Sequence, residues 1–435
     1  MLNLDQHPEH ANALITAALK AADPVTALQR HWNITDLHGD IHLLAIGKAA
    51  RPMALEAFRH LGPRITRALI TAPPDQSDPR GLRPNTQLFP CDHPYPTQRN
   101  IEAAQAVRDF ITSASENDTL LCLISGGGSA HLCLPAGDLT LHDIIEVTRE
   151  LQLAGATIDE LNCVRKHCEL LKGGNLARLS RAGRLVAYIL SDVIGDKLDI
   201  ISSGPTAPDP TTYRDAQHVL ASHAITLPNI SAHLTSGILG DHPETPKPRD
   251  PAFARVTNRI IASNRQVTDA VAAAAQHLGF HIDEVEQQKQ GEAADVAAGL
   301  ANTAKRLQAV SRPTACILGG EWTVTVSSGG AGAAAGTGGP SQELALAFAL
   351  AAEQLRLDSC ALLAFSTDGH DGPTDAAGAI VTPLLPDQAR RKGLNPEAAL
   401  QRHDSHELLD ALSALVRVPP TGTNLNHIAA LLIYP

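Results

Sequence analysis

The sequence predicts two α/β domains, of which the first contains a mainly parallel sheet. Short apolar runs alternate with alanine-rich segments of helical period, and each run ends at a glycine, a proline or a polar turn. Of the 435 residues, 43% are hydrophobic but only 3% are aromatic, so the cores must consist of Leu, Ile, Val and Ala. Repeated strand–turn–helix units of this composition are typical of a parallel sheet that helices cover on both faces.

Four apolar runs are the expected strands of the first domain. They span residues 42–46, 68–72, 120–124 and 185–190. Ligands bind to open parallel sheets at the carboxyl ends of the strands. The residues that follow each run are therefore the first candidates for a functional site.

A proline-rich segment divides the chain. Four prolines fall among charged residues in 241–251, where they prevent a regular helix or strand. We therefore expect an N-terminal domain at 1–240, a linker at 241–252 and a smaller C-terminal domain at 253–435. In the second domain, strands are expected at 259–262, 314–318, 323–326, 362–365 and 428–434, with helices at 265–278, 292–307 and 342–355.

Charge and cysteine usage narrow the class of protein. The formal net charge of −11 argues against a nucleic-acid or anionic-membrane partner, because binding either one requires a basic face. The seven cysteines form no CxxC pair and are expected as reduced thiols. The N-terminus lacks the regions of a secretory signal, and no stretch of about 18 apolar residues is present to span a bilayer. These features favour a cytoplasmic protein.

A glycine-rich turn and a lysine follow two of the expected strands. The turn consists of Ser125, Gly126, Gly127, Gly128 and Ser129. Its backbone amides would wrap an anionic group such as phosphate, although a plain tight loop has the same composition. Lys48 lies at the start of the helix expected after strand 42–46, where a lysine opposes the helix dipole at a cost of about 0.3–1 kcal/mol if exposed. A nearby phosphate or carboxylate would offset this cost, so we expect Lys48 to bind an anion.

A group of cationic residues follows in 162–172. It contains Arg165, Lys166, His167 and Lys172. At helical spacing Arg165 and Lys172 fall near one face, where they suit a carboxylate or a triphosphate. The alternative is an ordinary basic helix surface.

Two aspartates follow the expected strand 185–190. Asp192 and Asp196 lie about one turn apart, and two carboxylates at a strand end suit Mg²⁺, which commonly binds one or two carboxylates together with phosphate oxygens. Aspartate is also a common turn residue, which is the alternative interpretation.

The second domain contributes weaker candidates. Asp368 and Asp371 follow the expected strand 362–365, as contacts to a metal or nucleotide or as anchors of a loop. Glu321, between two expected strands, is either a ligand or a buried structural carboxylate. The segment Ser327–Gly339 is almost entirely Gly, Ala and Ser, which is typical of a flexible loop and would also suit a lid over phosphates.

Taken in order, these motifs resemble the glycerate 2-kinase family of the DUF4147/MOFRL type, whose C-terminal half is called the MOFRL domain. The matching segments are Ile46–Ala50, His93–Pro96, Ser125–Ala130, Asn162–Gly174, Ser191–Thr206, Gly319–Glu321, Asp368–Asp375 and Thr421–Asn424. Each match is weak alone, but their common order along most of the chain is specific.

The resemblance implies a two-domain kinase with a Rossmann-like N-terminal domain and an active site in the cleft between the domains. Such an enzyme transfers the γ-phosphoryl group of ATP to the 2-hydroxyl of D-glycerate with Mg²⁺, and gives 2-phosphoglycerate and ADP. Its partners would be ATP and this small acid. The oligomeric state is left open, a homodimer included.

Site residues are assigned from the residues and the resemblance together. The catalytic residues are Lys48, on which the family's catalytic lysine falls, Asp192 and Arg165. Asp192 and Asp196 would bind Mg²⁺ or receive the hydroxyl proton, and Arg165 with Lys172 would bind the carboxylate of the acid. The residues assigned to cofactor binding are Ser125, Gly126, Gly127, Gly128, Ser129, Lys172, Glu321, Asp368, Asp371 and Asn424.

Three departures from the family pattern concern the substrate. Many members have Gly-Gly-Arg-Asn-Gln-Glu where this chain has Gly338–Glu343, so Pro340 replaces an arginine, and Arg165 or another cation would have to substitute. The preceding segment Ser327–Gly339 is longer and has no lysine, and His131 stands where an apolar residue is common. The sequence therefore predicts the reaction type more firmly than the preferred 2-hydroxy acid.

Two other functions are weighed against the kinase. Members of this family often carry the name hydroxypyruvate reductase. However, neither Gly47–Ala49 nor Gly126–Gly128 fits GxGxxG with an acidic residue about twenty positions later, as a nicotinamide-binding turn requires. A binding protein without catalysis is the second alternative, because Pro340 and the longer loop alter the family pattern.

Overall fold

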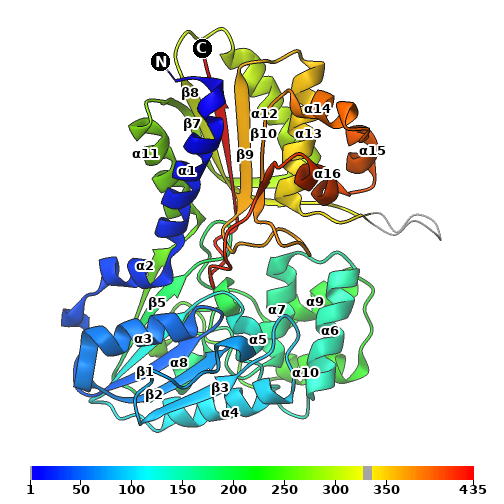
Figure 1. Cartoon of the computed structure of the whole chain (residues 1–435). Helices are drawn as coiled ribbons and strands as arrows, with labels where there is room; N and C mark the ends of the chain where they lie inside the picture. The colour runs from blue at the N-terminus through cyan, green and yellow to red at the C-terminus, as the bar shows by residue number, and fades with distance from the viewer. Residues whose placement is uncertain (1, 327–335) are drawn as a thin grey trace. The chain divides into compact units, whose positions relative to one another are not determined.

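The computed structural model describes residues 2–326 and 336–435, which divide into two compact units (Figure 1). The first unit is Pro24–Ile261. The second unit combines Met1–Asp23 with Ala262–Pro435, so helix α1 (His7–Ala22) belongs with the C-terminal half of the chain.

A six-stranded sheet in the order β3-β2-β1-β4-β5-β6 forms the centre of the first unit. Its strands are β1 (Ile41–Ile46), β2 (Ile65–Ala72), β3 (Thr86–Pro90), β4 (Thr119–Ile124), β5 (Arg184–Leu190) and β6 (Val256–Ala262). The pairs β3–β2, β2–β1, β1–β4 and β4–β5 are parallel, which confirms the predicted sheet. Every residue of β1 and β4 is buried, as expected for strands with both faces covered.

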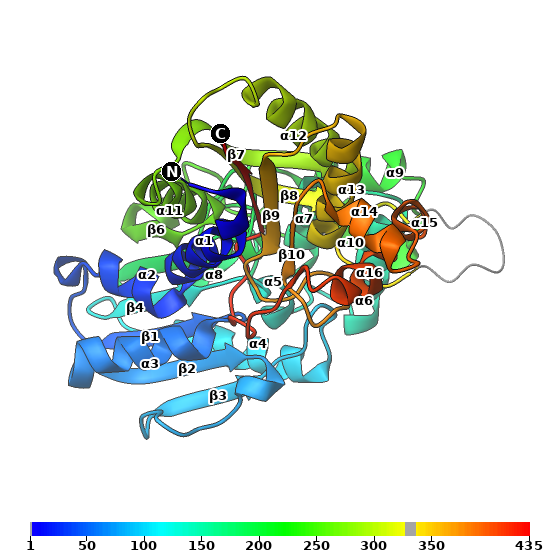
Figure 2. The ribbon, with the colours of Figure 1, turned by 45° about the horizontal axis from the view of Figure 1, so that its top comes forward.

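Helices cover this sheet and build a second core within the same unit. They are α2 (Pro24–His31), α3 (Ala50–Leu61), α4 (Gln98–Thr112), α5 (Gly128–His131), α6 (Leu141–Leu153), α7 (Ile158–Cys168), α8 (Asn175–Leu179), α9 (Tyr213–Ser222) and α10 (Pro228–Leu239). Alternate strand residues such as Leu44 and Ile46 pack with α4 and α8, and α3 contacts β1 and β2 (Figure 2). The other core joins α6, α7, α9 and α10.

The second unit contains a mixed sheet in the order β11-β10-β9-β12-β8-β7. Its strands are β7 (His281–Glu292), β8 (Thr314–Thr323), β9 (Cys360–Ser366), β10 (Gly378–Val381), β11 (Leu415–Val416) and β12 (His427–Ile433). Strands β7 and β8 are parallel, and the other neighbouring pairs are antiparallel.

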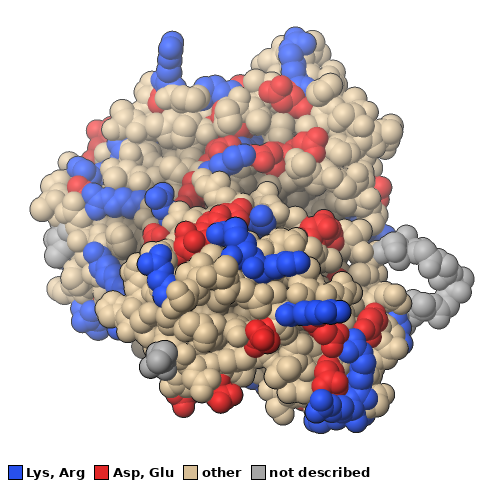
Figure 3. All heavy atoms as spheres, turned by 90° about the horizontal axis from the view of Figure 1, so that it is seen from above, with Lys and Arg blue, Asp and Glu red and all other residues tan. Residues whose placement is uncertain are grey.

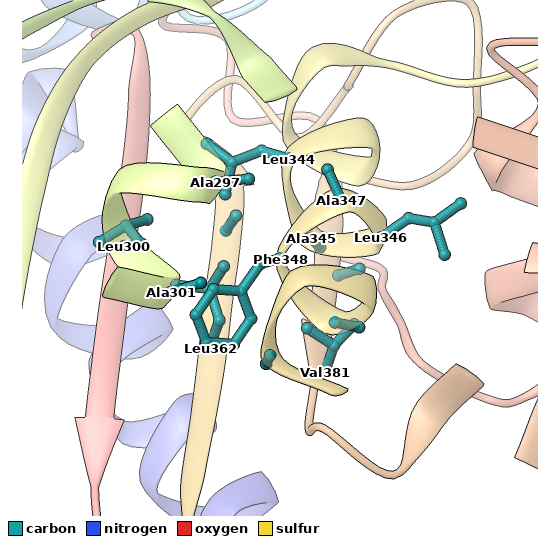
Figure 4. Close-up of a cluster of buried hydrophobic side chains, with 14 of the residues drawn as sticks. Ala297, Leu300, Ala301, Leu344, Ala345, Leu346, Ala347, Phe348, Leu362 and Val381 are labelled. Atoms are coloured by element: carbon teal, nitrogen blue, oxygen red, sulfur yellow. The ribbon is translucent and has the colours of Figure 1, made fainter. Parts of the chain in front are cut away.

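Helices lie on both sides of this second sheet. They are α1, α11 (Asn264–His277), α12 (Ala293–Leu307), α13 (Pro340–Gln354), α14 (Leu385–Arg391), α15 (Pro396–Gln401) and α16 (Ser405–Ala411). Figure 1 shows α1 and α11 on one side and α12 and α13 on the other. Phe348 of α13 is fully buried near Ala301 of α12 and Leu362 of β9 (Figure 4). Burying one such ring contributes about 1.5–3 kcal/mol.

Most predicted strands are present, with three differences. The runs 314–318 and 323–326 were expected as separate strands, but one strand, β8, spans Thr314–Thr323, and residues 324–326 are not in a strand. The run 259–262 belongs to β6 of the first sheet rather than to the second domain. Strands β3, β7, β10 and β11 were not predicted, because β3 and β7 have no continuous apolar run and β10 and β11 have only 4 and 2 residues.

The predicted linker does not coincide with the division between the units. Residues 241–252 are part of the first unit, which continues to Ile261. Thr245 is buried and donates to Asp209 Oδ2 at 3.0 Å, and the amide of Asp209 donates to the carbonyl of Pro246 at 3.0 Å. The prolines exclude helix and strand here, but an irregular segment can still pack when its polar groups find partners.

Of the helices that the structure describes, none is both long enough and apolar enough to cross a bilayer. On the face shown in Figure 3, Lys and Arg side chains are interspersed with Asp and Glu side chains. That face therefore carries mixed charge.

Candidate active site

The candidate site lies where β1, β4 and β5 of the first sheet end. These strands are adjacent and parallel, and Ile46, Ile124 and Ile189 are in register near their carboxyl ends. The polar turns that follow the three strands therefore begin at one edge of the sheet, where open α/β sheets bind ligands.

Hydrogen bonds join the turn after β1 to the glycine-rich turn after β4. The amide of Lys48 donates to the carbonyl of Gly126 at 2.9 Å, and the amide of Ala49 donates to Ser125 Oγ at 3.0 Å. Ser125 Oγ donates in turn to the carbonyl of Ile46 at 3.1 Å. Lys48 is partly buried and lies two residues before α3. The backbone of Lys48 is thus fixed against the glycine-rich turn.

Asp192 approaches the glycine-rich turn from the end of β5. A Cβ added at Gly126 would lie 2.5 Å from Asp192 Oδ2, so a side chain at 126 would displace the carboxylate. Gly127, with φ of +84°, is the N-cap of the short helix α5. Burial raises the pKa of Asp192, whereas the charge of Lys48 lowers it. The glycine-rich turn is therefore flanked by the carboxylate of Asp192 and the side chain of Lys48, and it leads into the first amides of α5.

Hydroxyl groups connect the glycine-rich turn to two further segments. Ser129 Oγ lies 2.7 Å from Ser203 Oγ, which donates to Asn162 Oδ1 of α7 at 2.6 Å. Ser202 Oγ donates to the carbonyl of Ser125 at 3.1 Å. Ser202 and Ser203 have φ of +51° and +61°, which costs a non-glycine residue of order 1–3 kcal/mol and is common at functional sites. No sequence pattern identified Ser202.

The predicted pairing of Arg165 with Lys172 is not what the structure shows. Helix α7 ends at Cys168, so helical spacing does not extend to Lys172. Lys172 is fully buried in an ion pair with Glu169, and Glu169 Oε1 also lies 3.7 Å from Arg165 Nε. Burial lowers the pKa of Lys172. The charge of Arg165 acts on His93, which lies beside the glycine-rich turn, while Lys172 pairs with the carboxylate that contacts Arg165.

His93 received little weight in the sequence, but the structure places it beside the glycine-rich turn. A Cβ added at Gly127 would lie 3.1 Å from His93 Cδ2 and 3.4 Å from Lys48 Cγ. Desolvation, followed by the charges of Lys48 and Arg165, lowers the pKa of His93 to about 4. The signal that could have found it is the motif His93–Pro96, which follows the unpredicted strand β3.

The candidates of the second unit lie near neighbouring strand ends of its own sheet. Glu321 is an exposed residue of β8, Asp368 follows β9, and Asn424 precedes β12. The amide of Thr421 donates to the carbonyl of Asp368 at 3.1 Å, so the loops after β9 and before β12 are in contact. Asp368 Oδ1 accepts from the amide of His370 at 3.0 Å, which shapes its own turn. Nucleotide contacts by these residues stay predictions.

Asp371 anchors a helix. Its Oδ1 accepts from the amide of Ser341 at 2.9 Å, and its Oδ2 accepts from the amide of Gln342 at 2.8 Å. These amides open α13, whose N-cap residue Gly339 has no side chain to bind them. Asp371 is 1% exposed, and its burial raises its pKa to about 6. Of the two roles considered for this aspartate, the contacts support the anchor.

The raised pKa of Asp371 makes stability depend on pH. The folded value of about 6 exceeds the ordinary value of 3.8, so the native state holds this proton more tightly and loses stability as pH rises through that interval. The full loss is about 3 kcal/mol. We expect Asp371→Asn to remove this contribution, which urea unfolding at several pH values from about 4 to 7 would measure. The exposed Asp358→Asn is the control, and equal slopes in all three proteins would contradict the assignment.

The segment Ser327–Gly339 is described only in part, because residues 327–335 lie outside the described residues. At its end, the amide of Gly336 donates to the carbonyl of Arg402 at 2.9 Å, and the amide of Thr337 donates to Asp404 Oδ1 at 3.0 Å. Pro340 is the first residue of α13, a position that favours proline. Pro340 is therefore compatible with the first turn of α13. Its presence in place of the family arginine removes one cation from this segment.

A Mg²⁺ ion would find hard oxygen ligands at Asp192. Asp196 lies in the same turn, where its amide donates to the carbonyl of Val193 at 3.1 Å. Among residues 2–326 and 336–435 no three His, Cys, Asp or Glu side chains group as a metal site. Mg²⁺ needs only one or two carboxylates when phosphate oxygens complete its coordination, so Asp192 fits this ion as a shared ligand.

Known proteins resemble this chain over nearly its whole length. The family described as a domain of unknown function, DUF4147, matches residues 10–235, and the MOFRL family matches residues 314–427. A glycerate 2-kinase from Pyrococcus horikoshii is 35% identical over 97% of this chain and 96% of its own length. The chain belongs to the glycerate 2-kinase family. A crystal structure of glycerate kinase from Thermotoga maritima is 33% identical with a TM-score of 0.87, and the match covers 99% of this chain and 100% of that chain.

The name hydroxypyruvate reductase also occurs among the relatives of this glycerate 2-kinase family member. A protein of Agrobacterium vitis with that name is 34% identical over 97% of this chain and 93% of its own length. Relatives named as glycerate kinases come from several organisms and include a solved structure, so the comparisons favour the kinase over the reductase.

Proposed function

We propose that the chain is an ATP-dependent kinase that phosphorylates the 2-hydroxyl of D-glycerate and releases 2-phospho-D-glycerate and ADP. The observation that carries this proposal is the grouping of Lys48, the glycine-rich turn and Asp192 at adjacent strand ends. Phosphoryl transfer requires mainly that the reactants be positioned and that charge on the phosphates be neutralised. The site supplies both functions through a lysine, backbone amides and a Mg²⁺-binding carboxylate.

Each residue receives one role in this proposal. Lys48 and the amides of Gly126–Ser129 bind phosphate oxygens. Asp192, with Asp196 in the same turn, binds Mg²⁺, which would neutralise charge on the phosphates. Arg165 binds the carboxylate of glycerate and replaces the arginine that Pro340 removes. The contact between Glu169 and Arg165 fixes the guanidinium, and Lys172 fixes Glu169.

The reductase is the second candidate because relatives carry its name. The geometry gives it less support, since the glycine-rich turn leads into a helix of only four residues, Gly128–His131. A dinucleotide-binding turn leads into a full crossover helix and needs an acidic residue for the ribose. The turn after β4 instead faces a lysine and an aspartate.

The test measures both activities on the same purified protein. ADP release is followed in a coupled assay with ATP, Mg²⁺ and D-glycerate, beside a screen of other short 2-hydroxy acids. NADH and NADPH oxidation with hydroxypyruvate is followed in parallel, and NMR reads the phosphorylated position. We expect ADP release dependent on D-glycerate and a 2-phosphorylated product. Oxidation of NADH or NADPH without ADP release would favour the reductase, and ATP binding without turnover would favour a binding protein.

We also propose a cytoplasmic location and a homodimer. Size-exclusion chromatography with light scattering would measure the oligomeric state.

A further inference from the structure

The turn that carries His93 is fixed to α5, the helix that follows the glycine-rich turn, by one buried side chain. Asn100 of α4 is fully buried, and its Oδ1 accepts from the amide of Asp92 at 3.1 Å. Its Nδ2 donates to the carbonyl of Asp92 at 2.9 Å and to the carbonyl of Ala130, in α5, at 3.0 Å. The backbone next to His93 is therefore held at a set position relative to α5.

The His93 ring stands beside the region where the phosphates and the acceptor would lie. A Cβ added at Gly127 would be 3.5 Å from His93 Nε2 and 3.4 Å from Lys48 Cγ, so ring and lysine flank the same glycine. The residue His93 is solvent-exposed even though its surroundings partly desolvate the ring, so a bound molecule can reach it. Resting on the function proposed above, we propose that His93 is the base that accepts the proton of the acceptor hydroxyl.

The proton balance of this step is simple. As the hydroxyl oxygen of the acceptor bonds to the γ-phosphorus of ATP, its O–H bond breaks and the proton passes to His93. The bond from the γ-phosphorus to the bridging oxygen breaks, and its electron pair leaves with ADP. The ring then returns the proton to water. Asp192 is less suited to this task, because a carboxylate that binds Mg²⁺ has its lone pairs engaged.

The charges around His93 keep the ring neutral before substrates bind. Lys48 from the turn after β1 and Arg165 from α7 both lower its pKa, after desolvation. His131 of α5 is a second neutral ring near enough to interact electrostatically with His93. Burial lowers the pKa of His131 to about 4, and its Nδ1 lies 3.2 Å from the carbonyl of Thr71. The phosphates and the substrate carboxylate offset both cations, so binding should raise the pKa of His93 toward its ordinary value of about 6.5.

The first experiment reads the ring directly and does not depend on turnover. The wild-type protein is titrated by NMR, with the His93 signal assigned through the His93→Gln variant, in the presence and absence of a non-hydrolysable ATP analogue with Mg²⁺. We expect the pKa of His93 to rise by about one unit or more on binding. A pKa that does not move on binding would overturn the proposal, even if the wild type proved inactive on glycerate.

The second experiment compares the kinetics of His93→Gln with those of the wild type and of His218→Gln, an exposed control on α9. We expect kcat to fall roughly 100-fold with KM for ATP and glycerate within about threefold, and the fall of kcat at acidic pH to disappear. Exogenous imidazole should restore part of the activity of His93→Ala. A variant with kcat near wild type, or one that keeps the acidic limb, would overturn the role of His93. An inactive wild type would instead refute the proposed function.

Discussion

Replacing Lys48 by alanine should lower kcat by about 1000-fold while the protein stays folded. The side chain lies against the glycine-rich turn, and removing one preorganised charge from the site of phosphoryl transfer costs about 4 kcal/mol at the upper end of measured effects. Lys48→Arg keeps the charge but not the compact ammonium group, so we expect intermediate activity. The measurement is ADP release at saturating ATP, Mg²⁺ and D-glycerate, with circular dichroism as the check on folding.

The electrostatic contacts of Lys48 supply an independent check on this prediction. Lys48 lowers the pKa of His93 and of Asp192, so Lys48→Ala should raise both. NMR titration of His93 measures this without any turnover. The exposed Lys305→Ala on α12 is the control and should change neither kcat nor these titrations. If Lys48→Ala retained the wild-type kcat, the assignment of Lys48 to phosphate binding would be wrong.

The parallel sheet could be predicted because its strands carry their signal in their own residues. The strand Ile41–Ile46 is buried at every position, so its sequence is a continuous apolar run. The strands Thr86–Pro90 and His281–Glu292 lie at sheet edges and are partly or largely exposed, so their sequences contain polar residues and escape this pattern. An apolar run therefore indicates a strand that is buried on both faces, and it does not identify strands that lie at a sheet edge.

The site residues that directly follow a strand could be predicted from the sequence. Contacts between residues far apart in the sequence could not. Lys48, Ser125 and Asp192 follow predicted strands, and the parallel sheet brings them to one edge. The shared helical face predicted for Arg165 and Lys172 is wrong, because α7 ends at Cys168. A ligand contact by Lys172 stays a prediction. The capping of α13 by Asp371 joins segments that are far apart in the sequence, and no local pattern encodes such a contact.

The Asp192→Asn substitution tests the metal-binding part of the site. Asparagine keeps the size of the side chain but removes the negative charge. We therefore expect weaker Mg²⁺ binding and less neutralisation of the phosphate charge by the metal. We expect kcat to fall about 1000-fold at a fixed low Mg²⁺ concentration, as removing several kcal/mol of metal-based stabilisation implies. The measurement is a Mg²⁺ titration of ADP release, together with Mn²⁺ binding followed by electron paramagnetic resonance.

The comparison with Asp196→Asn makes this prediction specific. The Oδ2 atom of Asp192 lies next to Gly126 of the glycine-rich turn, where a bound phosphate would lie. The amide of Asp196 closes its own turn through the carbonyl of Val193. We therefore expect Asp196→Asn to weaken Mg²⁺ binding less than Asp192→Asn does. Because burial raises the pKa of Asp192, protons compete with the metal as pH falls, and the wild-type affinity for Mg²⁺ should decrease on acidification. This decrease should be smaller in Asp192→Asn, in which only Asp196 and the phosphates still compete for protons. Equal Mg²⁺ affinity in Asp192→Asn and the wild type would assign the metal to other ligands and leave Asp192 with an electrostatic role only.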